Sequence, residues 1–337
     1  MNNQLSDWRE QALQFEQQIN RTVLGQQQAI RNCIISVFAR GHVLLEGGVG
    51  VGKTTLLRAI AQGLGGAYQR IEGTIDLMPA DLIYYTYLDN KGKPQVDPGP
   101  LLKQGENLAT FFFNEINRAR PQVHSLLLRV MAERSVSAFN QEYQFPHIQV
   151  FADRNRIEKE ETFELPAAAR DRFMMEINID MPDDDVHLTE LAFNSRFHDV
   201  DKLIGEVEPG KIAYFELNEL AMQIQQTIQS SSALKKYVLD LWKASKHPEK
   251  YGIRLSDTEM EQLIQSGASP RGVSYLIRAA KVNAWMANRT SLLPEDIQAV
   301  FPVTMGHRIF LSPVYSYRKE QLLPELITNI LDRIAAP

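Results

Sequence analysis

The sequence predicts an α/β domain with a parallel central sheet, followed by a second domain made mainly of helices. A short apolar run, His42–Glu46, is followed at once by a glycine-rich loop and a helical segment. Further apolar runs alternate with helical or irregular chain, which is the pattern of a parallel sheet covered on both faces. After Pro182 helical periodicity dominates, so we expect a domain boundary there.

The elements of the first part of the chain can be placed in order. Apolar residues at helical spacing predict an N-terminal helix over residues 1–20 that packs on the main domain. The α/β core is expected over residues 21–182, and it begins with a helix at Gln26–Ala39. The expected strands are His42–Glu46, Tyr68–Glu72, Thr110–Phe113 and Ile148–Ala152, with a helix at Thr54–Leu64 after the first of them.

Two segments interrupt the alternation and are expected to be hairpin inserts. The segment near 84–98 carries Asp89-Asn90-Lys91-Gly92 between extended flanks. The segment near 135–145 alternates apolar and polar residues around Asn140-Gln141. We interpret Glu158–Glu161, later in the core, as a solvated helical face.

The second domain is expected over residues 183–337 and to be helical. The acidic run Asp183–Asp185 is expected to cap its first helix, since acidic residues favour the N-terminus of a helix. The other helix candidates are Asn218–Ser230, Ser232–Lys246 and Pro270–Ala287.

The composition narrows the class of protein. The 337 residues are 44% hydrophobic and 23% charged, which is ordinary for a globular chain. A net charge of −5 argues against a protein that binds nucleic acid through a basic face. The single cysteine, Cys33, cannot build a disulfide framework. A polar N-terminus and the lack of a long apolar stretch predict a cytoplasmic protein with no integral membrane segment.

Residues 47–54 read Gly-Gly-Val-Gly-Val-Gly-Lys-Thr and fit the phosphate-binding pattern G-x-x-x-x-G-K-[ST]. The glycines let backbone N–H groups wrap phosphates, and the N-terminus of the following helix faces the same anion. Lys53 is expected to reach the β- and γ-phosphates, and Thr54 to bind Mg²⁺. With ATP and Mg²⁺ as cofactors, the predicted nucleotide-binding residues are Gly48, Val49, Gly50, Val51, Gly52, Lys53, Thr54 and Thr55.

Phe111–Glu115 is an apolar strand that ends in polar residues, which is typical of a Walker B segment. In that pattern an Asp holds the hydration shell of the metal, and a Glu activates the attacking water. This chain has Asn114 in the Asp position, and Asn offers the metal only a carbonyl oxygen. Glu115 is present, so we expect it to be the catalytic base.

Three further polar residues are predicted to complete the site. Asn155, just after a strand, is expected to orient the lytic water, the alternative being an Asn that forms a turn. Arg172 is expected to reach the γ-phosphate of a neighbouring subunit, with Arg170 as the alternative. Arg271 follows Pro270 at the start of a helix. We expect Arg271 to face the phosphates if the second domain folds over the nucleotide, and to report the nucleotide state as a domain rotation.

This order of motifs resembles the AAA+ superfamily and, within it, the MoxR family. The resemblance covers roughly residues 20–310. It implies a P-loop AAA+ core with a helical lid, assembly into a hexameric ring, and inserts that correspond to the two hairpins. It also implies a chaperone-like ATPase that acts with a von Willebrand factor A domain protein to mature or activate a client metalloenzyme or complex. The residues that carry it are His42–Gly47, Asp76–Asp81, Asp97–Pro100, Asn114–Ala119, Glu164–Pro166, Asp171–Phe173 and Gly267–Arg271.

Four segments look closest to the branch of the family that is encoded with methanol dehydrogenase. That resemblance implies help in assembling active methanol dehydrogenase, including its metal loading. The segments are Glu72–Met78, Tyr84–Tyr87, Phe111–Glu115 and Phe151–Arg156.

Two departures from the family pattern concern the metal site. Asn114 stands where most members have Asp, and Asp153-Arg154-Asn155-Arg156 stands where most read Thr-Gln-Asn-Pro. The superfamily sheet order places the two strands that lead to these residues side by side. We therefore hypothesise that Asp153 supplies the carboxylate that Asn114 lacks, the alternative being that Asp153 caps a turn.

The sequence leaves three functions open. An ATP-hydrolysing remodeller is supported by Glu115, Asn155, Arg172 and Arg271 together. An ATP-gated scaffold with very slow hydrolysis is supported by Asn114. A P-loop kinase or small-molecule transferase usually needs no arginine from a neighbouring subunit, so the predicted role of Arg172 disfavours this function.

Overall fold

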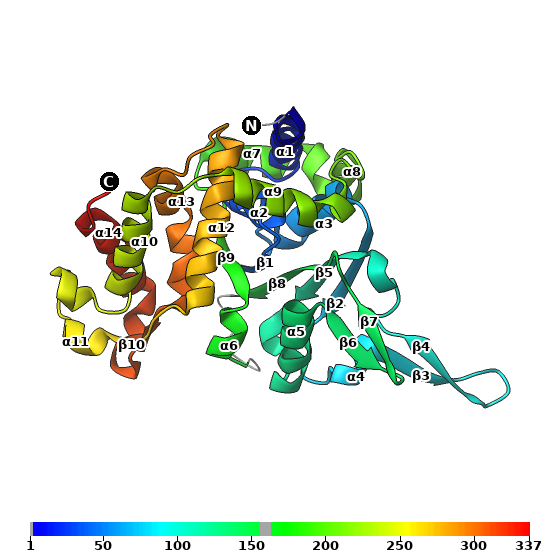
Figure 1. Ribbon diagram of the computed structural model, residues 1–337. Helices are drawn as coiled ribbons and strands as arrows, with labels where there is room; N and C mark the ends of the chain where they lie inside the picture. The colour runs from blue at the N-terminus through cyan, green and yellow to red at the C-terminus, as the bar shows by residue number, and fades with distance from the viewer. Residues whose placement is uncertain (1–2, 156–162) are drawn as a thin grey trace.

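The computed structural model describes residues 3–155 and 163–337. Its centre is a five-stranded sheet in the order β2-β5-β8-β1-β9, in which all neighbouring strands are parallel (Figure 1). This confirms the predicted α/β fold, and β8 lies between β1 and β5 as the family resemblance implies. The strands are β1 (His42–Gly47), β2 (Ala67–Glu72), β5 (Leu108–Asn114), β8 (Gln149–Asn155) and β9 (Phe173–Ile179).

Helices cover both faces of this sheet, which explains why its central strands are nearly continuous apolar runs. Val43 and Leu45 of β1 belong to one core cluster and Leu44 to the other, because successive side chains of a strand point to opposite faces. The first three helices pack on the Val43 side, and α5 packs on the Leu44 side. They are α1 (Asn3–Thr22), α2 (Gln27–Phe38), α3 (Lys53–Leu64) and α5 (Pro121–Glu133).

β9 is the strand of this sheet that the sequence pattern did not reveal. It lies at the edge of the sheet, beside β1. Glu176 and Asn178 interrupt its apolar residues, and Asn178 is exposed. A short run broken by polar residues lacks the continuous apolar signal by which buried strands are recognised.

Two antiparallel hairpins leave the parallel sheet, and both coincide with the expected inserts (Figure 1). The hairpins contact each other, because the rings of Tyr84 and Phe139 lie 5.4 Å apart. The first hairpin follows the short helix α4 (Pro79–Ile83). Its strands are β3 (Tyr84–Leu88) and β4 (Pro94–Pro98), and those of the second are β6 (Ser135–Ala138) and β7 (Gln141–Gln144).

The chain after Pro182 first returns to the core. Asp184 caps α7 (Asp185–Phe193) by accepting the N–H of His187 at 2.9 Å, which confirms the expected role of the acidic run. α8 (Val200–Gly205) then packs on α3. The position of the domain boundary stays a prediction.

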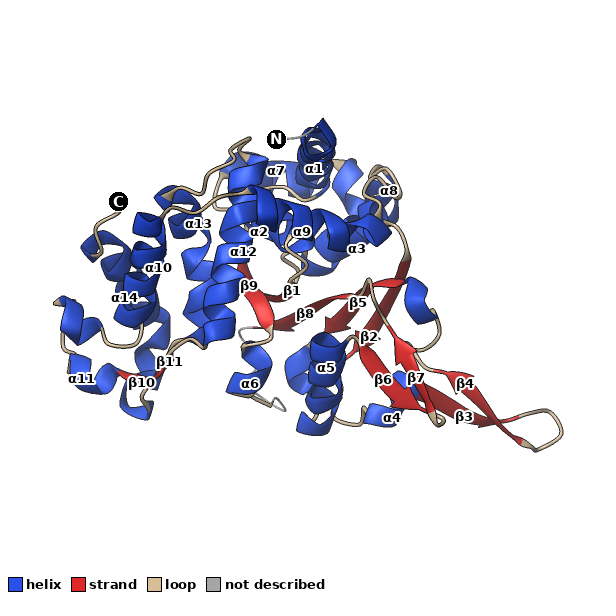
Figure 2. Cartoon of the chain, in the orientation of Figure 1, coloured by secondary structure: helices blue, strands red, loops and turns tan. Residues whose placement is uncertain are grey.

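Of the later helices, α12 (Pro270–Met286) and α13 (Pro294–Met305) lie beside β9 (Figure 2). Their apolar residues join the Val43 cluster, so the helical part and the core share one apolar interior. Helices α9, α10 and α12 fall within a few residues of the three helices expected there. The elements are α9 (Leu217–Thr227), α10 (Ser232–Ala244), α11 (Met260–Leu263), α12 (Pro270–Met286), α13 (Pro294–Met305), α14 (Lys319–Arg333), β10 (Ile264–Ser266) and β11 (Phe310–Leu311).

Two further expectations concern a surface segment of the core and a membrane span. The solvated face expected at Glu158–Glu161 lies outside them. Across residues 3–155 and 163–337, no helix combines the length and apolar character that a membrane span requires.

Candidate nucleotide-binding site

The glycine-rich loop joins the end of β1 to the start of α3. Gly50 and Gly52 have φ values of +78° and +90°, a left-handed backbone region that glycine adopts without steric cost. Lys53 is buried and folds back over this loop, where its Nζ donates to the carbonyl oxygens of Gly47 at 3.0 Å and Gly48 at 2.9 Å. The loop and the buried ammonium have the local geometry expected of a phosphate-binding loop.

A cavity of about 290 Å³ opens over this loop and brings most of the predicted site residues together. The polar ends of β8, which pairs with β1, and of β5, the next strand beyond β8, reach it. Of the predicted nucleotide-binding residues, Gly48 is outside the cavity lining. The residues that line it are Val49, Gly50, Val51, Gly52, Lys53, Thr54, Thr55, Asn114, Glu115, Asp153 and Asn155.

Asn155 connects the lysine to the predicted base. Its Oδ1 accepts from Lys53 Nζ at 2.6 Å, and its Nδ2 donates to Glu115 Oε1 at 3.1 Å. It is the last residue of β8, so it lies in a strand and not in a turn. Arg118 Nε lies 3.0 Å from the other carboxylate oxygen of Glu115. Both oxygens of the predicted base are therefore fixed by named partners.

Asp153 accepts a backbone N–H at the turn that follows β5 and also lines the cavity, so its support of a metal stays a prediction. It lies inside β8 and is 2% exposed. Its Oδ1 accepts the backbone N–H of Glu115 at 2.6 Å, which holds Glu115 in a left-handed conformation (φ 52°) that non-glycine residues adopt rarely. Its Oδ2 lies 3.7 Å from Lys53 Nζ. Burial raises the pKa of Asp153, against the N–H of Glu115 and the charge of Lys53, which lower it.

Asn114 has a partner that the sequence analysis missed. Its Nδ2 donates to Glu72 Oε1 at the end of β2. The signal was present in the sequence, because Glu72 ends one expected strand as Asn114 ends another. The carboxyl ends of neighbouring parallel strands meet at one edge of a sheet, but the sequence did not show that β2 and β5 are neighbours.

Comparisons with known proteins agree with this geometry. Residues 42–175 match the model of the ATPase family associated with various cellular activities (AAA), and residues 256–327 match that of the AAA lid domain. Over 99% of its length the chain is 58% identical to Protein MoxR of Methylorubrum extorquens, 97% of which is covered. It is 54% identical to Protein MoxR of Paracoccus denitrificans over 100% of this chain and 99% of that one. The chain belongs to the MoxR family of AAA+ ATPases.

More distant relatives extend this assignment. The chain is 31% identical to Chaperone MoxR1 of Mycobacterium tuberculosis, over 95% of this chain and 81% of that one. The crystal structure of a putative ATPase from Cytophaga hutchinsonii superposes with a TM-score of 0.80 at 28% identity, covering all of both chains. A helical AAA lid thus follows the α/β AAA+ core in this MoxR-family chain.

The predicted arginines of this MoxR-family chain lie outside the cavity around Lys53. Arg172 is half-buried, and its Nη1 donates to the carbonyl of Ala168 at 2.8 Å. Arg170, the alternative, is only 5% exposed and packs on the ring of Phe310 at 5.2 Å. Of the two, Arg172 is therefore the more accessible to a neighbouring subunit.

Arg271 does not face the phosphate loop of its own chain. Its Nη1 binds Asp171 Oδ2 at 2.7 Å. The same carboxylate accepts from Ser269 Oγ at 2.9 Å and from Arg308 Nε at 3.1 Å. The residue between Arg170 and Arg172 thus anchors the start of α12.

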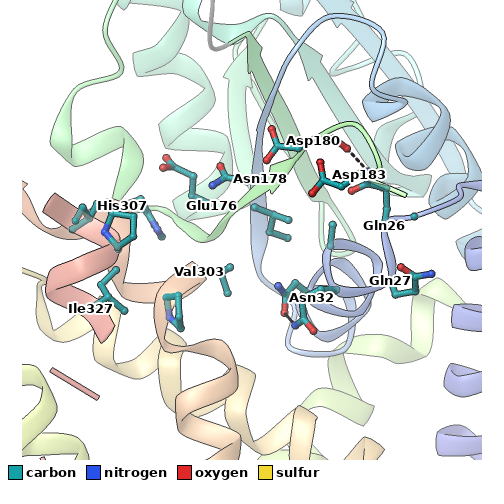
Figure 3. Close-up of a pocket in the computed structure, with 18 of the residues that line it drawn as sticks. Gln26, Gln27, Asn32, Glu176, Asn178, Asp180, Asp183, Val303, His307 and Ile327 are labelled. Atoms are coloured by element: carbon teal, nitrogen blue, oxygen red, sulfur yellow. Dashed lines mark hydrogen bonds between the residues drawn. The ribbon is translucent and has the colours of Figure 1, made fainter. Parts of the chain in front are cut away.

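A second cavity, of about 650 Å³, lies between the N-terminus of α2, the end of β9 and the lid helices α13 and α14. Figure 3 shows Gln26 and Asp180 on one side of it, and His307 and Ile327 on the other. The Gln26 side chain donates to the carbonyl of Asp180. Both segments reach the phosphate loop: a Cβ on Gly47 would lie 2.1 Å from the Ile179 oxygen, and one on Gly52 would lie 3.9 Å from Val23. Residues close in sequence to the lining of the second cavity therefore contact the phosphate loop.

Proposed function

We propose that this MoxR-family chain hydrolyses Mg·ATP and uses the cycle to mature or activate a client enzyme in a chaperone-like manner. The observation that carries the proposal is the link Lys53–Asn155–Glu115 within one cavity. It supports the proposal because it connects, by two hydrogen bonds, the three side chains to which we assign phosphate binding, orientation of the lytic water and proton acceptance. In phosphoryl transfer, catalysis consists largely of such positioning.

The residues of the cavity fit a magnesium nucleotide. Thr54, Asn114 and Asp153 offer oxygen atoms, the ligands that Mg²⁺ prefers. Among the described residues, no group of three or more His, Cys, Asp and Glu could hold a metal ion by itself. This agrees with an ion that is held mainly by phosphate oxygens. Thr54, Asn114 and Asp153 would hold the Mg²⁺, which would supply positive charge to offset that of the phosphates.

Each side chain then has a defined task. Lys53 holds the β- and γ-phosphates, Asn155 orients the attacking water, and Glu115 accepts its proton. The adenosine part extends into the cavity beside Gln26, where the lid helices can respond to it. Arg172, which lies outside the cavity of its own chain, faces the nucleotide of a neighbouring subunit in a hexameric ring. Arg271, which Asp171 holds outside the cavity, faces the phosphates when the lid folds further over the nucleotide.

The direct test is Glu115→Gln. We expect kcat for phosphate release to fall by roughly 10²- to 10⁴-fold, the usual contribution of a general base. ATP affinity, measured by calorimetry, should change little because the phosphate contacts of Lys53 remain. Glu106→Gln, which removes an exposed carboxylate before β5, is the matched control. A variant that still hydrolyses ATP at the original rate would contradict the role of Glu115.

The alternative function is an ATP-gated scaffold with very slow hydrolysis, which Asn114 favours because it brings no charge to the metal. The same measurement separates the two. A scaffold predicts phosphate release by the unaltered chain that is no faster than that of Glu115→Gln.

We further propose that the client is a metalloenzyme, namely methanol dehydrogenase, and that a von Willebrand factor A domain protein is the partner in the cytoplasm. The support is the resemblance of Glu72–Met78 and Phe111–Glu115 to that branch, together with the relatives named Protein MoxR. The test is to produce methanol dehydrogenase with the unaltered chain and with Glu115→Gln, and to measure its metal content. Equal metal content would exclude this client role.

A further inference from the structure

Asn114 and Glu72 form a pair at the ends of two neighbouring strands. We infer that Glu72 is a positioning residue that turns the carbonyl oxygen of Asn114 toward the nucleotide cavity and supplies the negative charge that Asn114 lacks. This inference rests on the proposed function, because the oxygen is presented to the magnesium nucleotide.

The backbone fixes this pair. Glu72 and Asn114 are register partners in the parallel ladder of β2 and β5. The next residue, Gly73, donates its N–H to the carbonyl of Asn114 at 2.7 Å. A Cβ on Gly73 would lie 2.2 Å from the backbone oxygen of Glu115, so only glycine allows this approach. The end of β2 is therefore held directly against the Asn114–Glu115 backbone.

The chemistry of the contact determines how the amide is turned. An ionised carboxylate can only accept hydrogen bonds, so Glu72 must face the Nδ2 of Asn114 and not its oxygen. Asn114 is 7% exposed and lines the cavity, whereas Glu72 is not part of the cavity lining. With Nδ2 bound outside the cavity, Oδ1 is the amide atom left to face it. Oxygen is the atom that Mg²⁺ requires.

Glu72 is itself held in place. Its other oxygen pairs with Arg70 Nη2 at 2.8 Å, and Arg70 packs over the ring of Phe112 at 5.6 Å. On the opposite side of β5, β8 contributes Asp153 to the same cavity. Asn114 thus lies between a carboxylate on each neighbouring strand. An Asp at 114 would place a second negative charge in contact with Glu72, which is unfavourable.

A charge exchange between the two positions tests the pair. Glu72→Gln removes the charge and lets residue 72 face either atom of the Asn114 amide, because Gln both donates and accepts. The double variant Glu72→Gln/Asn114→Asp moves the charge to position 114, where the amide introduced at position 72 can donate to one carboxylate oxygen and leave the other for the cavity. Glu106→Gln is the control, since it removes the same charge at the opposite end of β5.

Two measurements report on the metal without relying on turnover. Calorimetry gives the affinity for a non-hydrolysable ATP analogue with and without Mg²⁺, and electron paramagnetic resonance gives Mn²⁺ binding in its presence. We expect Glu72→Gln to weaken the metal-dependent affinity by roughly 10- to 100-fold, as is usual when the partner of a metal ligand is lost. The metal-free affinity should stay unchanged, and the double variant should recover most of the loss. Thermal unfolding of each variant verifies that it is folded.

The outcomes are separable from those of the proposed function. If Glu72→Gln binds Mn²⁺ and the Mg²⁺ complex as tightly as the control, Glu72 does not position Asn114. If the double variant is as weak as Glu72→Gln, the charge is not exchangeable between the two positions and the inference is also wrong. If the unaltered chain shows no affinity for adenine nucleotides with Mg²⁺, the proposed function itself fails.

Discussion

Two clusters of charged side chains in this molecule are built in opposite ways. The Lys53 cluster consists of Lys53, Glu115, Asp153 and Asn155, all from the α/β core and all around one cavity. The Asp171 cluster joins the core to the lid, because Asp171 binds Ser269, Arg271 and Arg308 from α12 and the segment after α13. The side chain of Arg271 remains 47% exposed there.

The difference agrees with the proposed roles of these residues within one subunit and between subunits. In the Lys53 cluster each charged group already has a partner within the chain, so the geometry for phosphates is preorganised. In the Asp171 cluster, Arg271 binds a carboxylate, and the neighbouring Arg172 binds a backbone carbonyl. Neither arginine lines the nucleotide cavity of its own chain. We therefore expect substitutions in the first cluster to act within one subunit, and substitution of Arg172, beside the second cluster, to act across an interface.

The largest expected effect is that of Arg172→Ala. An arginine supplied to the transition state by a neighbour is worth about 10³- to 10⁵-fold in kcat. Phosphate release should fall by that factor, while ATP affinity is nearly unchanged because Lys53 is intact. Mixing Arg172→Ala with Glu115→Gln should restore part of the activity, since some mixed interfaces combine an intact Glu115 with an intact Arg172.

Arg129→Ala is the matched control for this variant. Arg129 is an exposed arginine on α5 that pairs with Glu133 at 3.7 Å, and its loss should leave the rate unchanged. Failure of the mixture to regain activity, with both variants assembled, would place Arg172 outside the neighbour's site. The contrast between the clusters would then be lost.

The same contrast explains what could be predicted from the sequence. Each residue of the Lys53 cluster lies near the carboxyl end of a strand: Lys53 after β1 and its glycine loop, Glu115 after β5, and Asn155 at the end of β8. Apolar runs predict such strands, so the sequence predicts that Lys53, Glu115 and Asn155 share one site. Contacts between distant segments leave no such local pattern. The Asp171–Arg271 pair joins residues 100 positions apart. Neither that pair nor the Glu72–Asn114 contact could be read before the strand order and the position of the lid were known.

Asp153 offers a test of the intermediate size, within the Lys53 cluster. Asp153→Asn keeps an oxygen that can accept the N–H of Glu115 but loses the charge, whereas Asp153→Ala loses both. If the carboxylate supports the metal site, Asp153→Asn should lower Mg·ATP turnover by roughly 10- to 100-fold. If Asp153→Asn turns over Mg·ATP as fast as the unaltered chain and only Asp153→Ala is impaired, the role of Asp153 is to cap the turn at Glu115 and not to support the metal. Asn114→Asp, measured alongside, shows whether a second carboxylate can substitute.

The smallest expected effect concerns how the free energy of unfolding depends on pH. It has one sign for His307, beside the Asp171 cluster, and the opposite sign for Asp153 in the Lys53 cluster. His307 is buried beside Arg308, and burial together with the charges of Arg308, Arg170 and Arg154 holds its pKa well below its ordinary value. The folded chain therefore keeps His307 neutral, while the unfolded chain takes up a proton below a pH of about 6.5. Proton uptake by the unfolded chain alone lowers the free energy of unfolding as the pH falls below that value, by about 1.4 kcal/mol per pH unit. Above that pH the burial of neutral His307 carries no such loss. The raised pKa of Asp153 acts in the reverse direction, since its contribution is lost as the pH rises.

Urea unfolding of the unaltered chain and of His307→Gln, at several pH values between 7.5 and 5.5, measures this term. Gln does not titrate, so we expect the free energy of unfolding of His307→Gln to fall less steeply with acid than that of the unaltered chain. His247→Gln, at an exposed histidine, should follow the unaltered chain. Parallel profiles for all three proteins would mean that His307 takes up its proton equally in the folded state. The junction between core and lid would then be more open to water than the burial of His307 implies.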